Sequence, residues 1–227
     1  MSQPRVFAYI IASVGPNYKL RGTVPWVKKG KVFFGPCKKR MRPGVKNGDY
    51  IMGISPAGVG EQRRGLLWMR AEEPMTFAQA YERGETDRLF RLARGNAIHV
   101  RPKKGIHNNA GNPDTYEHIP HATHSSDWRT DIDGNRDAFL VGITGSWAAG
   151  EHGPLVTEEL VDLLRQGITW RGHANIQNPL TESPRGKHAL LVGNAARRVI
   201  EWVPEPTKPL ISSPSRTTCC HRKCSCE

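Results

Sequence analysis

Residues 32–55 read VFFGPCKKRMRPGVKNGDYIMGIS and place two runs of β-forming residues around a cationic loop. Residues 31–34 predict one short strand, which a Gly-Pro pair ends, and residues 50–55 predict a second strand. The turn signal Asn-Gly-Asp comes directly before the second strand. Two strands joined by a turn-rich loop predict that a sheet organises the start of the fold.

The other predicted elements are short and do not alternate regularly between strand and helix. Runs of β-forming residues predict strands at 6–13, 66–69, 138–144 and 189–192 and a short element at 197–203. Caps and apolar spacing predict helices at 77–83, at 87–94 and after Thr157. The polar residues 95–134 are interpreted as one long loop. The expected fold is α+β, with a mixed, mainly antiparallel sheet that curls or closes like a small barrel and a few short helices.

The length of 227 residues fits one large domain followed by a tail. Residues 1–203 are expected to form a single α+β domain. Residues 204–227 are rich in Pro, Ser and Cys and are expected to be a disordered tail. No apolar run reaches the ~18 residues that span a bilayer, and no signal-peptide cleavage site is evident. We therefore expect a cytoplasmic protein without a membrane partner.

The positive charge is concentrated at the start of the chain. The net charge is +12, and the first fifty residues hold eleven basic side chains against one acid, Asp49. That segment therefore carries a net charge of +10. Clustered Lys and Arg side chains displace counterions from phosphates, so the asymmetry favours a nucleic acid or nucleotide as partner. A basic face that serves only solubility is the alternative.

The loop after residue 34 has the side chains that phosphate recognition needs. Its cations can meet phosphate oxygens, and glycines allow tight turns and close backbone approach. The expected contacts are Lys38, Lys39, Arg40 and Arg42, with Gly35, Gly48 and Asp49 shaping the loop. The GxxxxGK[ST] order of a Walker loop is missing. Trp26 stands close to two lysines and is expected to stack on a base, whereas Trp68 is expected in the core.

These residues resemble a known family. The matching motifs are Gly15-Pro16-Asn17, Cys37-Lys38, Arg42, Gly48-Asp49, Ile51 and Gly53. In this order and spacing they resemble the nucleotide modification associated domains of bacteria and phages, most closely the second type. The resemblance covers about three quarters of the chain. Lys39 departs from the family pattern, in which Pro tends to follow Cys-Lys.

The resemblance implies a role beside systems that modify or process bases in DNA. Carried over residue by residue, it implies that Lys38 and Arg42 hold phosphate and that Asn17 contacts a base edge or fixes its loop. Gly48 and Asp49 would shape the turn before the second strand. Cys37 would be a nucleophile or a buried structural cysteine.

A His- and Asp-rich segment is the second candidate for chemistry. His99 and His118 lie among several further histidines and carboxylates between residues 95 and 134. Imidazoles and carboxylates can transfer protons or hold a metal. No HExxH motif organises them, so a solvated polar loop is the alternative.

The tail CCHRKCSCE contains the remaining cysteines. Cys220, His221 and Cys224 have a spacing that could hold zinc, but structural zinc sites usually draw ligand pairs from separated segments. An unstructured, oxidation-prone tail is the preferred interpretation. The sequence leaves open which cofactor, if any, the protein uses and in what oligomeric state it exists.

Three hypotheses remain. The first is a DNA- or nucleotide-binding domain that serves base modification or the recognition of modified bases, with phosphate held by the basic loop. The second is an enzyme that acts on a nucleotide or base through the His/Asp-rich segment. The third is a basic module that binds an acidic protein. Whether the protein is an enzyme is left open by the sequence.

Overall fold

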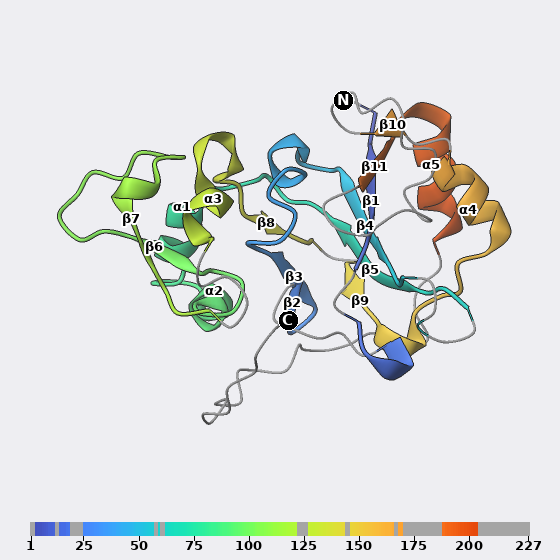
Figure 1. The fold of residues 1–227 in the computed structure, drawn as a ribbon, viewed down its shortest axis with the longest axis horizontal. Coiled ribbons are helices and arrows are strands. Elements are labelled where there is room, and N and C mark those ends of the chain that lie inside the picture. Colours follow the sequence, from blue (N-terminus) through green and yellow to red (C-terminus); the bar gives the residue numbers. More distant parts are fainter. Residues whose placement is uncertain are drawn as a thin grey trace.

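A six-stranded sheet forms the centre of the protein (Figure 1). The computed structural model describes residues 3–11, 14–18, 25–56, 59, 62–121, 127–143, 146–165, 168–169 and 188–203. The strand order is β10-β11-β1-β4-β5-β9. The strands are β1 (Val6–Ile10), β4 (Tyr50–Ile54), β5 (Gly65–Arg70), β9 (Trp147–Ala148), β10 (Ile168–Thr169) and β11 (His188–Leu191).

The pairing in this sheet is mixed and mainly antiparallel. Strand β1 runs parallel to β4, with Val6 opposite Tyr50, and antiparallel to β11, with Val6 opposite Leu191. The other neighbouring pairs are antiparallel. The predicted α+β class is thereby confirmed. The described strands form open sheets, and no closed barrel is found among them.

Alternating side chains give the sheet two apolar faces. Val6 and Ala8 point to one face, which helices α4 (Glu158–Arg165) and α5 (Gly193–Trp202) cover. Phe7 and Tyr9 point to the opposite face. There they pack against a second sheet with the order β2-β3-β8, made of β2 (Trp26–Lys28), β3 (Lys31–Phe34) and β8 (Leu140–Val141). The period of two along each strand produces this layering.

The far face of the second sheet supports a helical lobe. Phe33 on β3 packs on Phe90 and Phe139, with ring centroids 5.2 and 6.3 Å away. The lobe contains α1 (Phe77–Arg83), α2 (Arg88–Ala93), α3 (Trp128–Ile132) and a two-stranded sheet of β6 (Val100–Pro102) and β7 (Tyr116–His118). Figure 1 shows this lobe on the left, with β2, β3 and β8 between it and the large sheet.

The interpretation of residues 95–134 as one long loop is wrong. Strands β6 and β7 and helix α3 all lie within it. Strand pairing in β6–β7 is supported by an ion pair from Arg101 Nε to Glu117 Oε1 at 2.8 Å, and Val100 and Tyr116 are fully buried. Each element is only three to five residues long, so its hydrophobic periodicity is too short to detect in the sequence.

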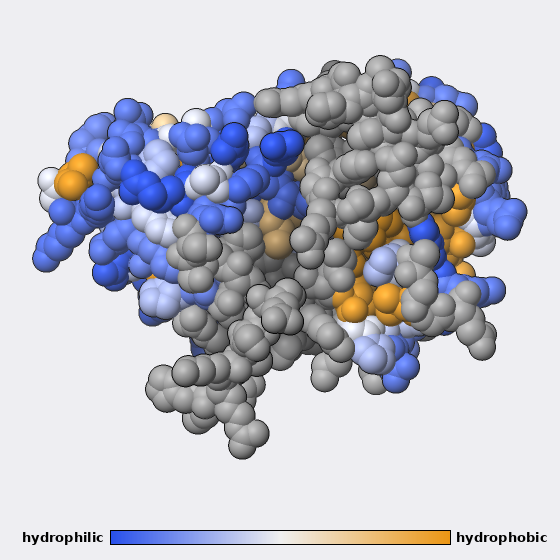
Figure 2. Space-filling view, in the orientation of Figure 1, coloured by the Kyte–Doolittle hydropathy of each residue, from blue (hydrophilic) through white to orange (hydrophobic). Residues whose placement is uncertain are grey.

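The hydropathy of the surface differs between the helical lobe and the large sheet. Figure 2 shows a largely hydrophilic surface over the helical lobe and more apolar surface over the large sheet. Within the described ranges, no helix has both the length and the apolar character needed to cross a membrane. The tail predicted for residues 204–227 lies outside the described residues.

Candidate functional site

The basic turn, defined as residues 37–42, follows β3 and reaches both parts of the fold. Figure 1 shows it as the blue loop between β1 and α3. Close backbone approach positions its start, because a Cβ atom on Gly35 would lie only 1.9 Å from the carbonyl oxygen of Ala97. Past the turn, Gly48 has a φ of 84°, and Asp49 Oδ2 accepts a hydrogen bond of 2.7 Å from the N–H of Lys46. These contacts fit the loop-shaping role expected for the two glycines and Asp49.

Lys38 turns inward toward the central sheet. Its Nζ lies 4.8 Å from the centre of the Tyr9 ring. Burial lowers the pKa of the Lys38 ammonium, and the electrostatic effect of the adjacent Cys37 sulfur opposes part of that shift. Burial also raises the pKa of Tyr9 well above its usual value, so its phenol stays neutral. The backbone of Lys38 is left-handed, with a φ of 57°, a conformation that costs energy for a side chain of this kind.

Arg42 is fully buried, which corrects the expectation that it holds a phosphate. Its Nε donates to the carbonyl oxygen of Cys37 at 3.1 Å, and its Nη2 donates to that of Asp131 at 2.7 Å. Its Nη1 donates to the carbonyl oxygens of Arg136, at 2.8 Å, and Ala138. Burial lowers the pKa of Arg42 to about 10 despite nearby carboxylates. The guanidinium therefore ties the basic turn to α3 and to the chain that follows it.

Trp26 is also placed in the core, which corrects the expectation that it stacks on a base. It is 3% exposed, and its ring packs on Phe33 with centroids 5.2 Å apart. Trp68, expected in the core, is 7% exposed. Asn17 is exposed and has a φ of 55°, so it forms part of a left-handed turn after β1.

Lys39 turns the opposite way from Lys38 and contacts α3. Its Nζ donates to Thr130 Oγ1 at 2.5 Å and lies 3.6 Å from Asp131 Oδ1. The other carboxylate oxygen, Asp131 Oδ2, lies 3.5 Å from His99 Nε2. Lys39 is half-buried, whereas Asp131 and His99 are buried. Asp131 therefore joins the basic turn to the histidine-rich segment.

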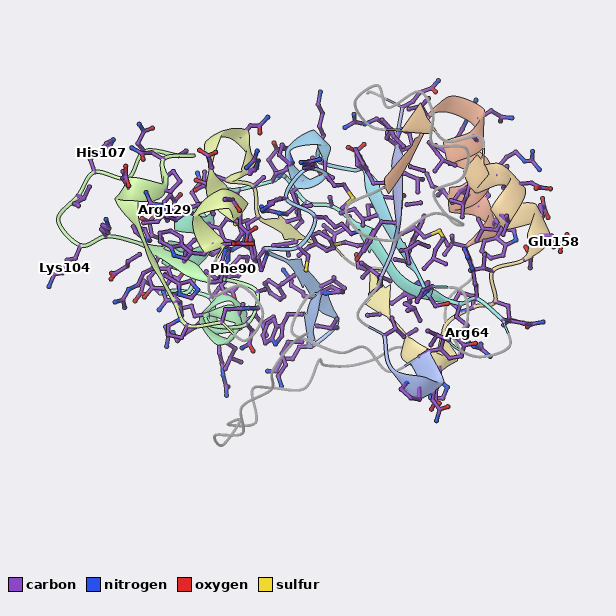
Figure 3. The ribbon with its side chains drawn as sticks, viewed as in Figure 1. Arg64, Phe90, Lys104, His107, Arg129 and Glu158 are labelled. Atoms are coloured by element: carbon purple, nitrogen blue, oxygen red, sulfur yellow. The ribbon has the colours of Figure 1, made fainter. Side chains whose placement is uncertain are left out.

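His118, on β7, is a second neighbour of His99. The centroids of these two rings are 6.5 Å apart. The half-buried His118 ring stacks on Trp128 at 5.9 Å with an interplanar angle of 18°. Arg129, the second residue of α3 (labelled in Figure 3), lies over the Trp128 ring at 5.4 Å and pairs with Asp114. His118 is thereby held at the edge of the lobe by stacked rings.

His121 completes this group of imidazoles in the helical lobe. It is buried, its ring centroid lies 6.2 Å from that of His99, and its Nε2 lies 2.5 Å from the carbonyl oxygen of Asn96. In the ranges that the structure describes, no three His, Cys, Asp or Glu side chains are positioned to hold a metal ion. The zinc candidates Cys220, His221 and Cys224 lie outside those ranges.

Several basic side chains of the first fifty residues are used within the fold. Arg5 pairs with Asp49 at 2.5 Å, and Lys31 lies 3.7 Å from Glu72 Oε1. Arg40 and Lys46 are exposed, and neither forms an ion pair with another described residue. Arg40 and Lys46 therefore carry outward charge that no described acid offsets, and the half-buried Lys39 adds a cation that Asp131 partly neutralises.

The structure thus brings the two predicted sites together at one carboxylate. The sequence indicates Lys39 and His99 individually and Asp131 only as one of the carboxylates of the His- and Asp-rich segment, and it gives no role to Thr130 or to Trp128. Asp131 had a weak signal, as one acid among many in a polar segment. Nothing in the sequence indicates that it faces residue 39.

No protein-family model, curated protein or solved structure matches the chain. The resemblance to nucleotide modification associated domains therefore remains a prediction from its motifs. The function must be inferred from the residues of the site.

Proposed function

We propose that the protein binds the phosphate groups of a nucleic acid or nucleotide at the outer surface of the basic turn. The contact between Lys39, Thr130 and Asp131 carries this proposal, because it holds one cation in a defined position beside the exposed Arg40. A preorganised cation beside a second, adaptable one suits a phosphate with several acceptor oxygens.

The number of outward cations sets the expected strength of binding. Lys38 and Arg42 point inward, so two or three phosphates, not five, would be neutralised by Lys39, Arg40 and Lys46. Each neutralised phosphate adds about 0.7 to 0.9 to the slope of log affinity against log salt. Binding should therefore depend on salt with a slope of roughly 1.5 to 3.

Anisotropy of a labelled oligonucleotide, titrated with protein at several salt concentrations, tests this proposal. Arg40→Ala should weaken binding and reduce the salt slope by about 0.7 to 0.9, because one phosphate contact is lost. Lys104→Ala is the matched control, since Lys104 is an exposed cation at the far end of the helical lobe (Figure 3). An affinity that does not change with salt, or equal losses in the two variants, would contradict the proposal.

The resemblance gives this binding a biological setting. We propose that the domain serves DNA base modification, or the recognition of modified bases, in the cytoplasm. Mass spectrometry of nucleotides that co-purify with the protein would test this setting. Recovery of a modified nucleotide would support it, and recovery of only unmodified nucleotides would count against a role in recognising modified bases.

A further inference from the structure

One carboxylate is shared between the basic turn and the histidines of the helical lobe. Asp131, on α3, is buried, and its Oδ1 lies 3.6 Å from Lys39 Nζ. Its other oxygen, Oδ2, lies 3.5 Å from Nε2 of His99, which is fully buried directly before β6. A change of charge on His99 therefore changes how much of the Asp131 charge is left to offset Lys39.

The charge of this contact can change near neutral pH, because imidazole is the side chain that titrates between about pH 5 and pH 8. While His99 is neutral, the Asp131 carboxylate offsets the positive charge of Lys39. When His99 is protonated, its imidazolium pairs with the same carboxylate, and the three side chains together gain one positive charge. Lys39 then meets an anion with less of its charge offset.

Two further imidazoles face His99 from β7 and from the segment that follows it. The ring centroids of His118 and His121 lie 6.5 and 6.2 Å from that of His99. A proton on one of these rings disfavours a proton on the next, so the three imidazoles titrate as a coupled group. His118 is half-buried, which gives this group access to protons from solvent.

The side of His99 toward α1 carries a buried cation at a greater distance. The edge of His99 packs on Phe77, with centroids 4.9 Å apart, and the Arg42 guanidinium lies over the Phe77 ring at 5.2 Å. Asp137 accepts a hydrogen bond from the Phe77 N–H at 2.8 Å and partly balances that guanidinium. Burial and Arg42 oppose a charged imidazole at His99, whereas the carboxylate of Asp131, in closer contact, favours it.

We propose that His99 makes phosphate binding at the basic turn dependent on pH, and that protonation of His99 strengthens the binding. The inference rests on the proposed function, because Lys39 is one of the cations that would hold phosphate. Asp131 carries the effect as the counter-ion that His99 and Lys39 share. His99 acts through Asp131 and is therefore a positioning residue. Because such coupling is reciprocal, bound phosphate must strengthen proton binding at His99 by the same factor.

The affinity of the full chain for a rhodamine-labelled oligothymidylate, measured by anisotropy at constant salt, tests this dependence. Neither its phosphodiesters nor thymine change charge between about pH 8 and pH 5.5, so the titrating groups belong to the protein. Wild-type protein should bind about fivefold more tightly at the lower pH, which is at the weak end of the usual range for coupled sites. An affinity that is equal at the two pH values, or weaker at the lower one, would overturn the inference.

Matched variants identify the titrating group. His99→Gln should bind with an affinity that changes by less than about twofold over the same range, because the proton acceptor is lost. His107→Gln is the control and should keep the wild-type dependence, since His107 is an exposed loop histidine in the same lobe (Figure 3). A wild-type dependence in His99→Gln would assign the effect to another group and overturn the role of His99.

Asp131→Asn tests the shared carboxylate and does not depend on whether His99→Gln folds. The carboxamide keeps the size of the side chain and the backbone carbonyl that accepts from Arg42. This variant should bind more tightly than wild type at about pH 8 and lose most of its pH dependence, because Lys39 no longer has its counter-charge. Weaker binding at that pH would contradict the inference.

The reciprocal effect can be read on the wild-type protein alone. Proton NMR of the His99 ring, followed against pH with and without saturating oligothymidylate, gives the titration midpoint. The oligonucleotide should raise this midpoint by about 0.7 pH unit, the logarithm of a fivefold coupling. An unchanged midpoint would overturn the inference.

The salt titration of the same oligonucleotide separates the two proposals. If the protein binds with the expected salt slope but the affinity does not depend on pH, the regulation by His99 fails and the binding function stands. If the protein does not bind at either pH, both fail.

Discussion

At the scale of single residues, Arg42 takes a positive charge into the interior and uses it to hold the basic turn. Its guanidinium donates to four backbone carbonyl oxygens, contributed by the turn, by α3 and by the segment after α3. Removing it would leave those carbonyls buried without a donor. Charge-assisted contacts of this kind are costly to break from one side.

Arg42→Ala should therefore lower the free energy of unfolding by about 3 to 5 kcal/mol. Urea denaturation followed by tryptophan fluorescence would measure the loss. Arg40→Ala, two positions earlier and exposed, should change stability by less than about 0.5 kcal/mol. Similar values for the two variants would mean that the interior contacts of Arg42 contribute little.

Lys38 gives the turn a dependence of stability on pH. Burial lowers its pKa in the folded protein below the ordinary value of 10.5, so the unfolded chain binds the proton more tightly. Below the folded pKa the whole cost of burying the ammonium is present. As the pH rises from the folded pKa toward 10.5, Lys38 loses its proton in the folded protein. The cost of burying the ammonium then disappears, and the free energy of unfolding rises.

Lys38→Met should remove that cost. The variant should be more stable than wild type at neutral pH, and the difference should shrink as the pH approaches 10.5. Denaturation at a series of pH values would show this, with Lys46→Met, an exposed lysine of the same loop, as the control. A difference that stays constant with pH would argue against a lowered pKa for Lys38.

At the scale of elements, the end of β3 is fixed by its contact with the chain before β6. A Cβ atom on Gly35 would approach the Ala97 carbonyl oxygen to 1.9 Å, and backbone cannot yield as a flexible side chain can. Gly35→Ala should destabilise the protein by about 2 to 3 kcal/mol. Gly65→Ala is a matched control inside a strand, since its nearest neighbours are at 3.4 Å or more, and it should be neutral or slightly stabilising. The melting temperatures of the two variants, compared with that of the wild-type protein in thermal unfolding, test this prediction.

The sequence predicts a helix or strand correctly where the residues of that segment alone define it. Lys31–Phe34 and Phe77–Arg83 were predicted with their observed bounds, because a run of β-formers and a capping Thr76 define them locally. The β2–β3 hairpin was missed, although Lys29 and Gly30 have the positive φ values, 47° and 73°, of a tight two-residue turn. Lys-Gly is a weak turn signal compared with Asn-Gly.

At the scale of the whole molecule, charge proved a poor guide to which side chains face solvent. A dense run of Lys and Arg suggested one outward surface, yet Arg42 became interior and Lys38 packed on Tyr9. Composition could identify the basic turn and the histidines as candidates. It could not predict that Asp131 lies between them, because that contact joins residues about ninety positions apart and depends on the packed lobe.

The position of β1 between β4 and β11 has a consequence for synthesis of the chain. On the ribosome, the second residue of the strand, Phe7, emerges long before its partner Leu190. Until then, one edge of the future central strand lacks its hydrogen-bonding neighbour. The nascent chain therefore leaves this edge unpaired for most of its translation, and the sheet can close only after the segment with Leu190 has emerged, so folding is late and the exposed edge is open to pairing with other chains.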